Sequence, residues 1–264
     1  LTIYILTLVK SLSFWDCGEY ITCSSILGVP HPPGNPFYIL LGRFFTALAG
    51  QTVSHALVVN FMSAFFSSLA VMFTYLITVK LVTIWIKQED VHYAYLTGVI
   101  AALYTAFSYS FWHNAIEAEV YGGLAFTINI IIYLTLIFTQ KSENFSHLNY
   151  LLLVIYLFFL GFGIHQTVLQ IAPAILFIAI YPQLTAAYKE KNKFWLRGGA
   201  YLFGLVIVYF IFNAIGEAIH VPDTSKMAFA IGIIVIIYFH TRHLISNKAW
   251  LITLLFVLIA FSTH

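Results

Sequence analysis

Long apolar runs separated by short polar segments make up almost the whole chain, and this alternation limits what it can fold into. Only 8% of the residues are charged and the mean hydropathy is +0.91, whereas soluble domains carry about 25% charged residues. A helix needs roughly 20 apolar residues to cross a bilayer, and several runs approach or exceed that length. The pattern predicts an all-α, polytopic transmembrane helix bundle.

The apolar runs predict about eight full spans after a truncated first helix, in a single transmembrane domain covering residues 1–264. The first run is too short to cross, which predicts a fragment that begins midway through a helix. The last apolar run ends at His264 without a polar tail, which predicts that the fragment also stops early. The run 37–49 is too short as well and carries Arg43 in its middle, so we expect an interfacial or re-entrant helix there. The expected spans are a partial one at 1–9 and full ones at 55–86, 93–109, 120–139, 148–163, 166–182, 198–215, 227–243 and 248–262.

Basic residues fall unevenly on the two sides of this predicted topology. If 37–49 does not cross, nine of the twelve Lys and Arg residues lie on one side, which the positive-inside rule makes cytoplasmic. If it did cross, every later loop would change sides and the basic loops would face outward. We therefore expect a multi-pass protein of the inner (cytoplasmic) membrane. Its extracytoplasmic side would receive the loop 10–54 and the segments around 113–119 and 161–166.

Asp16 and Glu19, in the first of these outer segments, are the candidate catalytic residues. A carboxylate beside hydrocarbon is costly to desolvate and is rarely placed there without a use. Three residues apart on a helix, the two would point to the same side, where one can act as a general base and the other as an electrostatic partner. The alternative is that they only solvate a loop, but the neighbouring Phe14, Trp15 and Tyr20 argue against a freely solvated turn.

His31 and Arg43 are candidate substrate-binding residues in the same loop. His31 lies in the stiff, proline-rich segment 30–36, whose alternative role is to end one helix and begin the next. From there it could donate a hydrogen bond to a phosphate or a sugar hydroxyl. The forked guanidinium of Arg43 suits a lipid phosphate, although snorkelling to ordinary head groups explains it equally well.

Four further candidates for substrate binding lie in the later outer segments: His113, Glu117, Glu119 and His165. On a helix Glu117 and Glu119 would diverge, so only one could face a site. His113 and Glu117 have a spacing compatible with two metal ligands, but no third ligand accompanies them. We assign no resident metal or other cofactor and leave a divalent cation open. For His165 the alternative is an ordinary helix-end histidine.

Five ordered motifs resemble a family of bacterial polytopic membrane proteins that was long catalogued as a domain of unknown function. That family is related to the transmembrane protein O-mannosyltransferase-like enzymes of animals and belongs with the GT-C glycosyltransferases. The resemblance covers roughly residues 1–170. The motifs are Ser-Phe-Trp-Asp-Cys-Gly-Glu at 13–19, His-Pro-Pro-Gly-Asn-Pro at 31–36, Leu-Gly-Arg-Phe-Phe at 41–45, Phe-Trp-His-Asn-Ala-Ile-Glu-Ala-Glu-Val-Tyr at 111–121 and Gly-Ile-His-Gln at 163–166.

The resemblance implies a GT-C-like fold and a membrane-embedded glycosyltransferase. Such enzymes place an acidic motif in the first extracytoplasmic loop and take a sugar, such as mannose, from a polyprenyl-phosphate donor. By position, this implies Asp16 as the catalytic carboxylate and Glu19 as its partner. The implied partners are a lipid-linked sugar, membrane lipid, and an exported polypeptide whose Ser or Thr is modified by an inverting mechanism.

Two other classes of function stay open on the sequence. A transporter or channel also gathers ionisable residues, but typically at the midplane on broken helices, whereas here they lie at helix ends. A non-catalytic subunit of an envelope or secretion assembly would need the helix faces and not the carboxylates. The net charge of +2 and the scattered basic residues argue against nucleic acid as a partner. Two cysteines, Cys17 and Cys23, are too few for a disulfide scaffold.

Overall fold

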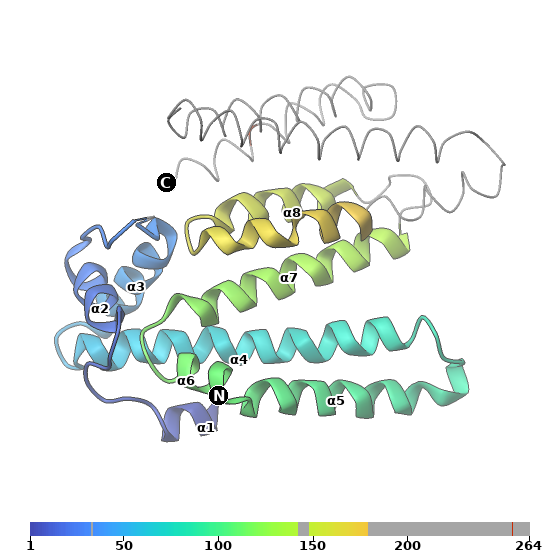
Figure 1. The fold of residues 1–264 in the computed structure, drawn as a ribbon, viewed down its shortest axis with the longest axis horizontal. Helices are drawn as coiled ribbons and strands as arrows, with labels where there is room; N and C mark the ends of the chain where they lie inside the picture. Colours follow the sequence, from blue (N-terminus) through green and yellow to red (C-terminus); the bar gives the residue numbers. More distant parts are fainter. Residues whose placement is uncertain (33, 142–147, 179–254, 256–264) are drawn as a thin grey trace, which may run out of the picture. The chain divides into compact units, whose positions relative to one another are not determined.

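The computed structural model describes residues 1–32, 34–141, 148–178 and 255, and every regular element within these ranges is helical (Figure 1). The all-α prediction is therefore confirmed for this part of the chain. The spans expected at 198–215 and 227–243, and at 248–262 apart from Leu255, lie outside the described residues. The expected count of about eight spans is therefore a prediction and not a finding.

Two long helices, α4 (His55–Val82) and α7 (Val120–Lys141), lie side by side along the bundle (Figure 1). Both are long and apolar enough to cross a membrane, which agrees with the spans expected at 55–86 and 120–139. Aromatic rings line their contact, for example Phe73 against Phe126 and Tyr133. The side-chain amide of Asn129 donates to the carbonyl of Ala70 at 2.9 Å. The described residues thus belong to a membrane protein in which aromatic rings pack between α4 and α7.

The span expected at 93–109 corresponds to one helix that ends two residues early and is followed by a sharp bend. Helix α5 (Val91–Phe107) follows a short 3₁₀ turn, η1 (Gln88–Asp90), and ends before Ser108, whose backbone is extended. Helix α6 (Tyr109–Ala115) then starts at an angle of 66° to α5. The pair counts as a third crossing segment only if its two bent halves form one broken span. The described residues therefore contain two or three membrane-crossing segments.

The other helices among the described residues are too short to cross by themselves. They are α1 (Thr2–Leu6), α2 (Cys17–Ile26), α3 (Pro36–Ala49), α8 (Leu148–Gly161) and the 3₁₀ helix η3 (Gln166–Ile171), which leads into a helical stretch ending at residue 178. Helix α3 has 14 residues, which agrees with the expectation that the run 37–49 does not cross. Proline at its start suits a first helical turn, because no backbone N–H is needed there.

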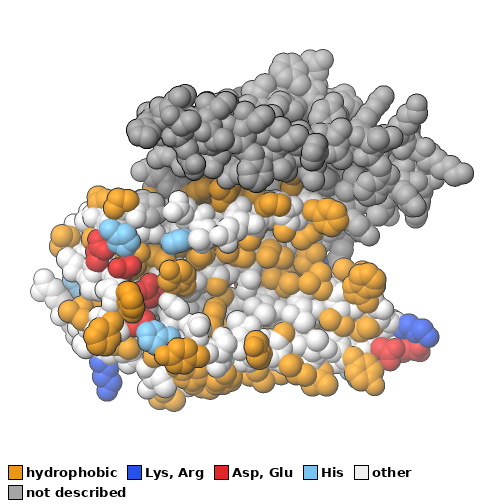
Figure 2. Space-filling view, in the orientation of Figure 1, with side chains coloured by type: hydrophobic (Ala, Val, Ile, Leu, Met, Phe, Trp, Pro, Cys, Tyr) orange, Lys and Arg blue, Asp and Glu red, His pale blue; other side chains and the backbone are white. Residues whose placement is uncertain are grey.

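Charged side chains lie at the two ends of the long helices and not along them. The turn between α4 and α5 at one end carries the pair Lys87 and Glu89, whose charged atoms are 3.6 Å apart. The other end, around α2, α3 and α6, carries a denser group of acidic and histidine side chains (Figure 2). This second end combines the first loop, the segment 113–119 and the turn 161–165, which the predicted topology assigns to one side of the membrane.

Candidate functional site

Asp16, Glu19 and His31 form an exposed group at the start of α2. Asp16 is the N-cap residue of α2 and Glu19 lies in its first turn, where the positive end of the helix dipole favours negative charge. Glu19 accepts hydrogen bonds from the backbone N–H of His31 at 2.6 Å and from its ring Nδ1 at 2.7 Å. The Nε2 of the same ring lies 3.9 Å from Asp16 Oδ2. The imidazole thus lies between the two carboxylates.

Glu19 and His31 stabilise each other's charged forms. The hydrogen bond from His31 lowers the pKa of Glu19, and the same bond raises the pKa of His31. Both side chains remain partly exposed, so water screens the pair. Asp16 has only the longer contact to the ring, its side chain makes no capping bond, and about half of it is exposed. Of these three residues, Asp16 is the one whose carboxylate faces solvent without a short ion pair.

The proline-rich loop that carries His31 is anchored by Asn35, which the sequence did not single out. Asn35 is almost fully buried and adopts a left-handed conformation with φ +43°. Its amide donates to the carbonyl of Ile164 at 2.6 Å, and its Oδ1 accepts from the hydroxyl of Tyr20 at 3.5 Å. The backbone N–H of Phe37 also donates to the carbonyl of Gly163 at 2.8 Å. The start of α3 is therefore tied to the turn 161–165.

A buried acidic group lies beneath the exposed one. Glu117, Glu119 and Cys17 are all buried, and one ligand atom from each lies within 4.8 Å of the others. Glu117 contacts His113 Nδ1 at 2.6 Å and accepts a short hydrogen bond from Ser13. The thiol of Cys17 lies 3.7 Å from Glu119 Oε1 and donates to it, and burial raises the pKa of that thiol, which keeps it protonated.

The expectation that Glu117 and Glu119 diverge was wrong. It assumed a helical backbone, but α6 ends at Ala115 and α7 begins at Val120, so the residues between them are not helical. The backbone there turns both carboxylates inward. The i, i+4 pair of His113 and Glu117 does form, as a histidine–carboxylate contact.

Asn60 is a polar residue inside the apolar run of α4. Its side-chain amide donates to the carbonyls of Val9 and Ser11, and these two bonds hold the start of the first loop against α4.

Burial raises the pKa of Glu119 to about 7, and the negative charges of Asp16 and Glu117 add to this shift. Cys17 follows Asp16 in the sequence and its thiol donates to Glu119, so the exposed and buried groups are neighbours; together they are called the acidic site. A carboxyl group that titrates near neutral pH suits proton transfer. Each of the two groups offers three ligand atoms within 4.8 Å. A divalent cation in the buried group would have to displace the thiol proton of Cys17, because the thiolate is the ligand form.

We expect the stability of the protein to fall as the pH rises from about 4.5, the ordinary pKa of Glu119, to about 7, its folded value. In this interval the folded protein keeps a proton that the unfolded chain loses, so unfolding becomes easier as pH increases. Each pKa unit corresponds to about 1.4 kcal/mol. Thermal unfolding in detergent across this pH range would measure the slope. Glu119→Gln should flatten the dependence of stability on pH, whereas Glu89→Gln, at the other end of the bundle, should leave it unchanged. Equal slopes in the unaltered protein and both variants would contradict the assignment of this dependence to Glu119.

Arg43 and His165 form no ion pair with the carboxylates of the described residues. The guanidinium of Arg43 donates to the carbonyl of Ser25, near the end of α2, at 2.6 Å. Its position on α3 thus directs it to the backbone of the neighbouring helix. His165 pairs through Nδ1 with the hydroxyl of Thr167 at 2.9 Å, and its ring centroid is 5.8 Å from that of Tyr121. Burial lowers the pKa of His165, which favours its neutral form.

Comparisons with known proteins bear on this site. Residues 16–188 match the family described as "Protein O-mannosyl-transferase TMEM260 N-terminal domain". The chain is 31% identical to protein O-mannosyl-transferase tmem260 of Dictyostelium discoideum over 139 residues, which are 52% of this chain and 16% of that protein. It is 30% identical to protein O-mannosyl-transferase TMEM260 of Mus musculus over 141 residues, 53% of this chain and 18% of that protein.

The matched part therefore covers less than a fifth of each of these two relatives. No solved structure matches the chain. The family match begins at Asp16 and includes both acidic groups, and it extends over well more than half of the chain. This chain belongs to the family of TMEM260 N-terminal domains.

Proposed function

We propose that the protein is a membrane-embedded protein O-mannosyltransferase in which Asp16 is the catalytic base. Two findings support this proposal. The chain belongs to a family described by that activity. Segments distant in sequence also place two neighbouring acidic groups, Asp16 with Glu19 and Glu117 with Glu119, at one end of an apolar bundle. The second finding carries the proposal, because a transferase acting at the membrane surface needs its base where a lipid-borne donor and a water-soluble acceptor meet.

The proposed reaction is a single displacement. A Ser or Thr hydroxyl of an exported polypeptide approaches from the extracytoplasmic side, and its oxygen attacks the anomeric carbon of mannose. The bond from that carbon to the phosphate oxygen of a polyprenyl-phosphate donor breaks, and the lipid phosphate leaves with the electron pair. The hydroxyl proton passes to the Asp16 carboxylate. One attack inverts the configuration at the anomeric carbon, as the resemblance to GT-C enzymes implies.

The surrounding residues support the base in this proposal. Glu19 and its bonded His31 hold the proline-rich loop over Asp16, and the ring can donate to a sugar hydroxyl or to the leaving phosphate. Glu119, with its pKa near 7, exchanges protons with the site and limits the charge beside Asp16. His113 and His165 lie on the flanks of the acidic site and are proposed to contact the donor. Arg43 is proposed to bind a head group from α3.

The test is sugar transfer by the purified protein in proteoliposomes. We expect mannose from polyprenyl-phosphate mannose to appear on a Ser/Thr-rich peptide added to the face that carries the acidic site, detected as a hexose mass on the peptide. Vesicles without the protein are the control. Uptake of a solute into the vesicles with no hexose on the peptide would replace this proposal with a transporter. Absence of both activities would favour a non-catalytic subunit.

A further inference from the structure

Trp15, the residue before the proposed base, holds its indole away from the rest of the protein. Its side chain is 89% exposed, more than any other large apolar side chain among the described residues. Its backbone has φ +61°, in the left-handed region that a residue with a bulky side chain rarely adopts. An indole left in water and a left-handed backbone both cost free energy. Backbone strain of this kind is typical of functional sites.

Contacts on both sides of Trp15 maintain this conformation. Two residues before it, Ser13 donates a short hydrogen bond to Glu117. Two residues after it, the thiol of Cys17 donates to Glu119. Both acceptors belong to the buried acidic group, so the chain is tied to the interior on either side of the exposed ring. The indole therefore projects from a fixed turn, and the surrounding structure sets its place beside the base.

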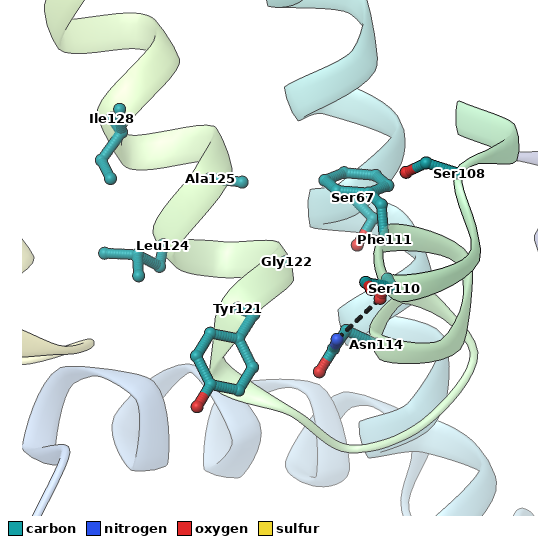
Figure 3. A pocket seen from close by; sticks show the side chains of 10 residues that line it. All are labelled: Ser67, Ser108, Ser110, Phe111, Asn114, Tyr121, Gly122, Leu124, Ala125 and Ile128. Atoms are coloured by element: carbon teal, nitrogen blue, oxygen red, sulfur yellow. Dashed lines mark hydrogen bonds between the residues drawn. The ribbon is translucent and has the colours of Figure 1, made fainter. Parts of the chain in front are cut away.

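The reacting sugar needs a site at this surface. A cavity of about 420 Å³ lies between α4, α6 and α7, with Asn114 and Tyr121 in its lining (Figure 3). No carboxylate of the acidic site is among the described residues that line it. In the proposed reaction the acceptor hydroxyl lies within hydrogen-bond reach of Asp16, and its oxygen attacks the anomeric carbon. The sugar must therefore lie at the open surface around Asp16 and not inside this cavity.

We propose that the indole of Trp15 is the surface on which the sugar ring of the donor stacks during transfer. One face of a pyranose ring carries mainly C–H groups, which pack against an aromatic face, while its hydroxyls point outward to water and polar side chains. Consecutive Cα atoms are about 3.8 Å apart, so this indole can reach a sugar whose anomeric carbon lies beside the Asp16 carboxylate. The inference rests on the proposed function and adds to it the residue that orients the sugar.

The bilayer surface is the other partner that an exposed indole can have, since tryptophan is enriched at membrane interfaces. The surroundings of Trp15 favour the sugar. Asp16 follows it directly, and the side chains of Asp16 and His31 are each about half exposed. Insertion of the indole into lipid would carry these ionisable groups toward hydrocarbon, which is costly. A sugar, in contrast, offers C–H groups to the ring and hydroxyls to the carboxylates.

The test is hydroxyl-radical footprinting of the unaltered protein in nanodiscs, with oxidation of each tryptophan measured by mass spectrometry. The probes are a short-chain polyprenyl phosphate mannose and the same polyprenyl phosphate without the sugar. We expect rapid oxidation of Trp15 in the protein alone, oxidation several-fold slower with the mannosyl lipid, and no change with the sugar-free lipid. Trp85, which is 86% exposed in the turn between α4 and α5, should react at the same rate in all three samples.

Three results would overturn the inference. Slow oxidation of Trp15 without either probe would show that the indole is covered by the bilayer. Equal protection by the two probes would show that the lipid, and not the sugar, covers the ring. Absence of protection by the mannosyl lipid at saturating concentration would show that no sugar lies on Trp15.

Substitutions separate the ring from the backbone strain. Trp15→Ala removes the ring and keeps the positive φ, whereas Trp15→Gly removes both. We expect each to weaken binding of the mannosyl lipid about tenfold, the scale of one aromatic contact, in calorimetric titrations in detergent. Binding of the sugar-free lipid should not change. Trp15→Phe should retain most of the affinity for the mannosyl lipid, and Trp85→Ala should retain all of it.

Thermal unfolding distinguishes this role from a structural one. Because the indole is exposed, the alanine and glycine variants should unfold close to the unaltered protein, and the glycine variant should be the more stable of the two because it relieves the strain. Weaker binding of both lipids together with early unfolding of both variants would instead assign the ring a structural role. The footprinting depends on no variant, so it decides the question if one of them misfolds.

Neither binding measurement requires an acceptor, so their outcome is independent of transfer. Sugar-dependent protection of Trp15 in a protein that transfers no mannose would refute the proposed function and leave the sugar site standing. Mannose transfer with an unchanged KM for the donor in Trp15→Ala would refute the sugar site alone.

Discussion

Asp16→Asn is expected to lower the rate of mannose transfer by about 10²–10⁴-fold, the usual effect of removing a positioned base. Asparagine has the shape of aspartate but cannot accept the hydroxyl proton at neutral pH. The cost in stability should be small, because the Asp16 side chain makes no capping bond and about half of it is exposed. Initial rates in the proteoliposome assay would measure the loss, with the thermal unfolding midpoint as the check on folding.

Two further variants separate a catalytic role from a general effect of charge. Glu89→Gln removes an exposed carboxylate at the opposite end of the bundle and should keep full activity. Glu19→Gln keeps Asp16 but weakens the hydrogen bonds to His31, so we expect a smaller loss than for Asp16→Asn and a lower pKa for His31. Full transfer activity in Asp16→Asn would remove Asp16 from the mechanism.

Asn35→Ala is expected to lower the free energy of unfolding by about 2–4 kcal/mol. Alanine cannot donate to the carbonyl of Ile164, which leaves a buried acceptor without its partner. It also carries the strain of a positive φ, which asparagine tolerates better than most residues. Since Asn35 joins the His31 loop to the turn 161–165, transfer activity should fall together with stability. Thermal and denaturant unfolding in detergent would measure the change.

Asn35→Gly separates the two contributions. Glycine adopts φ +43° without strain but also lacks the amide, so its loss should be about 1–3 kcal/mol, from the hydrogen bond alone. The expected order of stability is therefore the unaltered protein, then glycine, then alanine. If alanine proved as stable as the unaltered protein, the amide of Asn35 would not anchor the loop.

Sequence patterns predicted much of the helical frame. The apolar runs at 55–86 and 120–139 correspond to α4 and α7, and the short run 37–49 corresponds to α3. Such agreement is expected because a run of apolar side chains in lipid satisfies its backbone best as a helix. The span expected at 93–109 agrees with α5 to within two residues, whereas the short helix α6 that follows Ser108 was not predicted.

Sequence reasoning chose several residues that the structure brings close together, but it did not predict the contacts between them. Asp16 and Glu19 were chosen as a pair on one side of a helix and His31 as a residue of the same loop, and the structure places the histidine between the two carboxylates. Asn35 and Cys17 were not chosen as site residues, because nothing in the local sequence shows that an asparagine is a buried anchor or that a thiol donates to a carboxylate. Such roles depend on partners more than a hundred residues away.

The amino-acid sequence alone determined that this is a helical membrane protein with its ionisable groups at helix ends, because hydrocarbon excludes unpaired charge wherever the chain crosses it. Only the tertiary structure decided that Glu117 and Glu119 converge on Cys17, the residue that follows Asp16, in one buried group. The physical reason is that hydrophobicity is a property of each residue, whereas the burial and neighbours that set a carboxylate's pKa arise only when distant segments pack together.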